Sequence, residues 1–143
     1  WGFQIWPGMR SYSWTKLLLD GTIDHNEFDD EALEAVAASG ILKLPEGLDA
    51  VTVVRDFLHK IQECITPILV RLLRSRDLSS LSVEYCFTVP ATWSTDTQSQ
   101  MIQAARDAGF APRALDRIST VSEPEAAALA VLKHAAELHL KVS

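Results

Sequence analysis

The stretch from residue 81 to residue 143 alternates twice between an apolar run and a helical pattern, and this alternation constrains the fold most strongly. "LSVEYCFTV" (81–89) and "ALDRISTVS" (114–122) have the β-branched and aromatic content of strands. Helical patterns follow from about Thr95 to Ala108 and from about Glu123 to His139. A strand–helix–strand–helix order is typical of α/β folds, in which a helix connects two parallel strands. We therefore predict a parallel strand pair joined through a helix.

The first half of the chain is dominated by one long helical pattern, from Asp49 to about Leu73. Its apolar residues recur at i, i+3, i+4 and i+7, which predicts a helix with one buried stripe. Asp49 is placed to cap this helix, and Pro67 is expected to kink or split it. Upstream we predict a short strand at 1–6, a strand leading into a helical turn at 10–20, a loop at 20–30 and a short helix at 29–39.

These patterns divide the chain into two parts. Residues 1–80 form a small strand-plus-helix subdomain, mostly helical, and residues 81–143 form a β-α-β-α segment. The 143 residues suffice for a buried core. The chain starts with Trp1 in the middle of a strand-like pattern, so we expect it to be a segment of a longer protein.

Composition and charge exclude several classes of protein. The net charge of −6 argues against a nucleic-acid binder, which needs a basic face for phosphate contacts. No run of about 18 apolar residues is present, so no membrane span is expected, and no signal peptide is visible. We expect a cytoplasmic protein in which Cys64 and Cys86 are reduced and buried, a disulfide being the alternative.

The two strand–helix junctions carry the polar residues of interest. Pro90 lacks an N–H, so it ends the pairing of the first strand. Thr95 and Gln98 have the spacing of a capping box, and Gly109 is expected to end their helix. At the second junction Ser122 can cap the last helix, which leaves Glu123 as a surplus carboxylate.

Glu123 lies where open α/β sheets bind ligands, at the carboxyl end of a strand. A carboxylate in that position can hold metal-bound water near phosphate.

The motifs "FTVPATWSTDTQSQMIQAARDAGF" and "ISTVSEPEAAALAVLK" together resemble the ATPase domain of the seventy-kilodalton heat-shock (DnaK-type) chaperones. That family has a Val-Pro-Ala turn, a Gln-rich helix ending in Ala-Gly and an Asn-Glu-Pro-x-Ala-Ala-Ala helix in the same order. The match is strongest over residues 83–134, and "WGFQI…SWTKLLLD" extends it loosely toward the start. Because of its tryptophans and the Ser-Glu-Pro variant, the chain resembles a divergent eukaryotic branch of this family.

The resemblance implies a partial actin-like ATPase (ribonuclease H-like) lobe and a role for three residues. Glu123 matches the glutamate beside the nucleotide phosphates and the hydrated magnesium. Pro90 matches the proline that relays nucleotide state. Lys16 matches the catalytic lysine that positions the attacking water and the γ-phosphate; a surface lysine on an amphipathic turn is an equal alternative.

The chain also departs from the family. The relay arginine is absent, with Gln98 and Ser99 near its place, and the two phosphate loops and the Gly-rich adenosine segment are missing. Glycines in such loops let backbone N–H groups approach phosphate. We therefore expect ATP and Mg²⁺ to bind the full-length parent and neither to bind this segment tightly.

Several functions remain open at this point. The first is a segment of a chaperone-like ATPase, inactive by itself, whose partners are the rest of its nucleotide-binding domain and a client protein or co-chaperone. The second is another actin-like ATPase, such as a sugar kinase. The third is a non-enzymatic interaction module that has lost nucleotide binding. In each case an incomplete lobe should expose apolar surface and self-associate.

Overall fold

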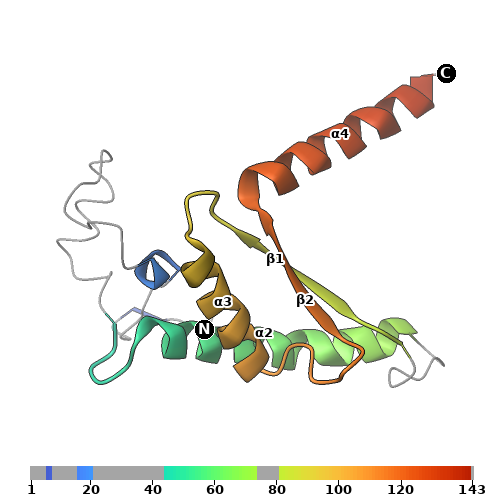
Figure 1. The fold of residues 1–143 in the computed structure, drawn as a ribbon. Coiled ribbons are helices and arrows are strands. Elements are labelled where there is room, and N and C mark those ends of the chain that lie inside the picture. The colour runs from blue at the N-terminus through green and yellow to red at the C-terminus, as the bar shows by residue number, and fades with distance from the viewer. Residues whose placement is uncertain (1–5, 8–15, 21–43, 74–80, 143) are drawn as a thin grey trace.

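Residues 6–7, 16–20, 44–73 and 81–142 are described by a computed structural model, and they form a small α/β fold (Figure 1). The elements are the 3-10 helix η2 (Leu17–Leu19), the helices α2 (Ala50–Leu73), α3 (Thr95–Asp107) and α4 (Glu123–Val142), and the strands β1 (Glu84–Val89) and β2 (Arg117–Ser122). The short strand predicted at 1–6 lies almost wholly outside the described residues. The predicted loop at 20–30 and helix at 29–39 also lie outside them, except for Asp20.

The two strands pair in parallel, as the alternation of strands and helices predicts. The register runs from Glu84 opposite Arg117 to Val89 opposite Ser122, and α3 connects the strands. β2 starts at Arg117, three residues later than the sequence suggests. The backbone turns just before it, where the Asp116 N–H donates to the Arg113 carbonyl at 3.0 Å.

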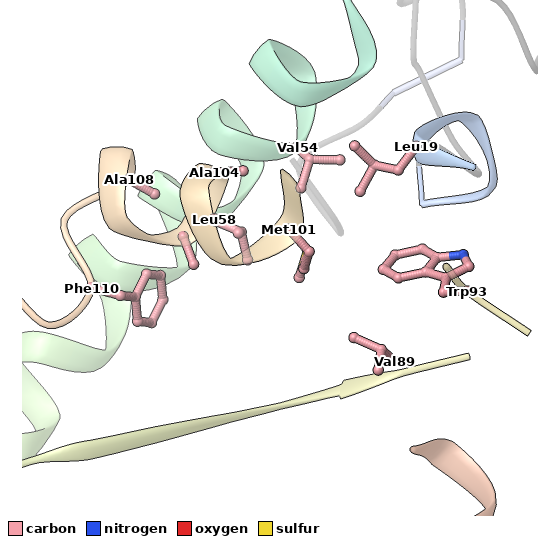
Figure 2. Close-up of a cluster of buried hydrophobic side chains, with 10 residues drawn as sticks. Leu19, Val54, Leu58, Val89, Trp93, Met101, Ala104, Ala108 and Phe110 are labelled. Carbon is pink, nitrogen blue, oxygen red and sulfur yellow. The ribbon is translucent and has the colours of Figure 1, made fainter. Parts of the chain in front are cut away.

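One face of this sheet packs against α2 and α3 and encloses the core (Figures 1 and 2). The buried apolar side chains come from η2, α2, β1, α3 and the loops after β1 and α3: Leu19, Val54, Leu58, Val89, Trp93, Met101, Ala104, Ala105, Ala108 and Phe110. Small alanines on α3 let α2 approach closely, and burial of this apolar surface is the main stabilising term.

The other face of β1 carries Glu84, Cys86 and Thr88, all exposed, because side chains alternate across a strand. The prediction that Cys86 is buried is therefore wrong. Cys64 is also exposed, on α2, and both thiols are free. A cysteine within an apolar run does not reveal which face of its strand or helix is covered.

Helix α2 confirms the prediction for its first turn but not the one for its interior. Asp49 caps α2 as predicted, with its Oδ1 accepting from the Thr52 N–H at 2.7 Å. Pro67 does not split this helix, which runs continuously for 24 residues. Pro67 is exposed, so the carbonyl left without a partner by its missing N–H can be hydrated.

The N-cap of α3 is Ser94, not Thr95 as the capping-box spacing suggested. Ser94 has an extended backbone (φ −63°, ψ 161°), and its Oγ accepts from the Thr97 N–H at 3.1 Å. The Gln98 side chain donates instead to the Trp93 carbonyl at 3.3 Å. Gly109 follows the C-cap residue of α3 with φ +97°, so the predicted glycine stop is confirmed.

The last helix, α4, points away from the rest of the fold (Figure 1). It begins at Glu123 as predicted and continues to Val142, three residues beyond the predicted end. Leu129, Val131 and Leu132 are 59%, 68% and 67% exposed. No described helix is both long enough and apolar enough to cross a membrane.

Candidate functional site

The candidate site lies where β1 and β2 end, and it brings together the three residues selected from the sequence. β1 ends at Val89, directly before Pro90, and β2 ends at Ser122, directly before Glu123. Because the strands are parallel and Val89 is opposite Ser122, both junctions open at the same edge of the sheet. Lys16, 107 residues before Glu123, reaches this edge from the start of η2.

Lys16 and Glu123 form an ion pair between Nζ and Oε1. Lys16 Nζ also donates to the carbonyl of Thr88, the second-last residue of β1, at 3.2 Å. The side chains of the pair are 40% and 47% exposed, so water reaches both charges. An exposed pair of this kind contributes about 0–1 kcal/mol, so a competing ligand could separate it at small cost.

Local structure holds each partner of the pair in place. Lys16 is the residue before the single turn of η2, where the Leu19 N–H donates to the Lys16 carbonyl at 3.3 Å. Glu123 starts α4, whose first turn is capped by Ser122 Oγ accepting from the Glu125 N–H at 3.3 Å. This confirms the predicted Ser122 cap. A carboxylate at that position is favoured by the positive end of the helix dipole.

Pro90 shapes the turn that closes the site on the β1 side. The Trp93 N–H donates to the Pro90 carbonyl at 3.2 Å, which folds residues 90–93 into a tight turn. Val89 before it is 2% exposed, so the strand end is anchored in the core. The sequence had indicated Pro90 as a strand stop, and the structure places it beside Thr88 and Trp93.

Trp93 was not selected from the sequence, yet it lies at this site. Its ring centroid is 5.6 Å from Lys16 Nζ, within the range of a cation–π interaction. The side chain is 4% exposed and also belongs to the core (Figure 2). The one available signal was a large aromatic residue in the polar stretch "ATWSTDTQ", two residues after the Pro-Ala step.

The site supplies few metal ligands. Among the described residues no group of three or more His, Cys, Asp or Glu side chains could hold a metal ion. Mg²⁺ usually keeps several waters and binds one or two carboxylates together with substrate phosphates. Glu123 fits that outer-sphere role, whereas a metal site made by these residues alone does not fit.

A second polar cluster lies at the opposite, amino end of the strands. The Asp116 carboxylate accepts from Arg113 Nη2 at 2.6 Å, from Arg113 Nε at 2.9 Å and from the Val83 N–H at 3.2 Å. The Arg113 guanidinium holds the pKa of Asp116 below its ordinary value. Arg113 Nη2 also donates to the Leu81 carbonyl at 2.8 Å, so this cluster ties the loop after α3 to the start of β1.

A hollow of about 280 Å³ adjoins this second cluster. It is lined by Gln62, Thr66, Leu69, Tyr85, Pro112, Arg113 and Asp116. Burial raises the pKa of the Tyr85 hydroxyl there. The polar groups of Arg113 and Asp116 bind each other and the backbone, so this cluster stabilises the fold, and the candidate site is the opposite edge.

No protein-family model, curated protein or solved structure matches this chain. The geometry of the strand ends is therefore the basis on which a function can be argued.

Proposed function

We propose that this chain is a segment of a nucleotide-binding domain like that of the seventy-kilodalton heat-shock chaperones, with an actin-like ATPase lobe. Its parent protein binds ATP with Mg²⁺ and hydrolyses it. The observation that supports this proposal best is the contact between Lys16 and Glu123 at the carboxyl ends of β1 and β2, beside Pro90. The resemblance assigns Lys16 and Glu123 to the phosphate site and Pro90 to the relay of nucleotide state, although the three are distant in sequence.

In this proposal Lys16 and Glu123 act on the phosphate end of the nucleotide. The Lys16 ammonium binds the γ-phosphate and orients the attacking water, as positively charged groups do in phosphoryl transfer. Glu123 would hold Mg²⁺ through the waters of the ion, and the metal would supply charge neutralisation at the phosphates. The Lys16–Glu123 pair opens when the ligand enters, and its exposure keeps that cost small.

The isolated chain is expected to have no measurable ATPase activity. The site contains the Lys16–Glu123 ion pair, and the sequence lacks both phosphate loops. Phosphate release from Mg-ATP should equal the buffer background, and Glu123→Ala should not change it. Turnover that survives purification and disappears in Glu123→Ala would contradict this expectation.

The parent protein provides the decisive test. We expect calorimetric titration to show Mg-ATP binding that Lys16→Met and Glu123→Ala weaken. Lys133→Met is the matched control, since Lys133 is an exposed lysine on α4. Equal loss in the control would show a general charge effect in place of a specific site.

A second candidate is an interaction module that keeps the fold without nucleotide binding. Two observations favour it: Gln98 stands near the place of the relay arginine, and α4 exposes Leu129, Val131 and Leu132. Absence of Mg-ATP binding in the parent protein would select this candidate. Phosphorylation of a sugar by the parent would instead select the sugar-kinase alternative.

A further inference from the structure

Lys16 is held by more than its acidic partner: its Nζ also contacts the Thr88 carbonyl and the Trp93 indole ring. We propose that Trp93 is a positioning residue for Lys16, holding the ammonium at the ends of β1 and β2 when Glu123 is engaged elsewhere. The positioning is a property of this chain alone, and its use in phosphate binding rests on the proposed function.

The chemistry of the indole favours this role over simple core filling. Trp93 is 4% exposed, and its Nε1–H is buried without a hydrogen-bond partner among the residues that the structure describes. A buried donor without an acceptor is costly, and a phenylalanine would fill apolar space without that cost. Indole, however, binds a cation more strongly than the ring of phenylalanine does. The Lys16 ammonium, 5.6 Å from the ring centroid, is the contact that gives the indole its advantage.

Contacts of both the ring and the backbone keep Trp93 in place. Figure 2 shows the six-membered ring directed toward Met101 and the nitrogen edge turned away from it. The Trp93 backbone is held as well, since its N–H donates to the Pro90 carbonyl and its carbonyl accepts from Gln98 Nε2. A ring fixed by the core and the turn gives Lys16 a rigid surface to rest on.

Trp93 and the Thr88 carbonyl together can hold Lys16 without Glu123. The carbonyl accepts from Nζ at 3.2 Å. The indole ring and the carbonyl carry no charge, so hydrated Mg²⁺ would bind the Glu123 carboxylate and leave both contacts of Lys16 in place. The lysine therefore stays at the strand ends when its ion pair opens.

Gln98 connects this arrangement to the rest of the fold. Its Nε2 donates to the Trp93 carbonyl at 3.3 Å, and its Oε1 accepts from Thr120 Oγ1 at 3.5 Å, on β2. Gln98 stands near the place of the absent arginine. A shift of the turn after Pro90 would thus move the indole and with it Lys16.

The test is the environment of the Lys16 side chain in the nucleotide-free chain, observed by NMR with labelled lysine. The chain has five lysines, and Lys16→Met identifies the signals of Lys16. We expect the Lys16 ε-methylene resonances upfield of the other four, because they lie over an aromatic ring. Trp93→Leu should remove this shift and Trp93→Phe should reduce it. Trp6→Leu, at a tryptophan 69% exposed, should leave it unchanged.

Glu123→Gln separates the two ways of holding Lys16. If Trp93 positions the lysine, the upfield shift persists in this variant. Collapse of the shift in Glu123→Gln, or wild-type Lys16 signals among those of the other lysines, would overturn the proposal. The wild-type and Glu123→Gln spectra decide the matter even if Trp93→Leu does not fold.

The role in ligand binding has its own measurement in the parent protein. Trp93→Phe should weaken Mg-ATP binding several-fold, and equal binding would overturn that role. A wild-type parent that binds no Mg-ATP would refute the proposed function while leaving the NMR result for Lys16 intact.

Discussion

Phe110 connects the end of α3 to β1, and its replacement by leucine tests how the sheet is held on the helices. Phe110 is 4% exposed, and its backbone N–H donates to the Ala105 carbonyl at 3.0 Å. Its ring meets Tyr85 and Phe87 edge to face, each at 5.2 Å between centroids, with interplanar angles of 88° and 76°. One aromatic side chain thus carries two contacts to the inner face of β1.

The expected cost of Phe110→Leu follows from those two contacts. Leucine keeps most of the apolar burial, while each aromatic pair contributes about 0.5–1.5 kcal/mol beyond its buried area. Loss of both predicts a decrease of about 1–3 kcal/mol in the free energy of unfolding. A domain is stable by only about 5–15 kcal/mol, so this loss is readily measured.

Urea unfolding followed by circular dichroism is the assay. The midpoint should fall while the slope stays unchanged, since the surface exposed on unfolding is nearly the same. Leu115→Ala is the control: Leu115 is 61% exposed in the same loop region, so its removal should change stability by no more than about 0.5 kcal/mol.

A double-mutant cycle with Phe87→Leu isolates one ring pair. The two substitutions should show a coupling of about 0.5–1.5 kcal/mol, because removing either ring removes the same contact. Strictly additive effects would refute the edge-to-face contribution and leave apolar burial as the whole explanation.

Three further predictions concern an ion pair, a glycine that ends a helix and a helix cap. Because Arg113 lowers the pKa of Asp116, this carboxylate stabilises the fold above its ordinary pKa, and the contribution is lost as pH falls through the lower folded value. Asp116→Asn should therefore reduce the urea midpoint at neutral pH, and its difference from wild type should shrink in acid; a constant difference would contradict this. Gly109→Ala should cost about 1–2 kcal/mol in thermal unfolding, since φ is +97° there, and an unchanged midpoint would show that the helix end relaxes. Ser94→Ala should cost about 0.5–2 kcal/mol, whereas Thr95→Ala should cost less, and the reverse order would restore Thr95 as the cap.

Local patterns predicted the elements well where a single feature decides the structure. The apolar stripe and the Asp49 cap located α2, and Gly109 located the end of α3, because each depends on residues close in sequence. Pro90 marked the end of β1 for the same reason, since a proline has no N–H to donate to a neighbouring strand, whatever the position of that strand in the fold. Choices between adjacent residues were harder. Ser94 and Thr95 can both cap a helix, and the sequence favoured Thr95 because its spacing to Gln98 matches a capping box.

The candidate site shows the limit of such reasoning. The sequence, read with a family resemblance, selected Lys16, Pro90 and Glu123 one by one and left Lys16 equally explicable as a surface residue. Their meeting at one edge depends on the parallel pairing of β1 with β2 and on η2 packing beside α3. The exposure of Cys64 and Cys86 was likewise unpredictable, because it depends on which faces of α2 and β1 are covered.

By itself the sequence determined the order of strands and helices from α2 onward, the Asp49 and Ser122 caps, the Gly109 stop, and the carboxylate at the start of α4. These follow from hydrogen bonding and apolar periodicity within a few residues of each other. Only the tertiary structure brought Lys16 across 107 positions to Glu123 and placed the Trp93 ring beside it. Contacts of that range depend on how the sheet and helices pack, and packing is a property of the whole chain.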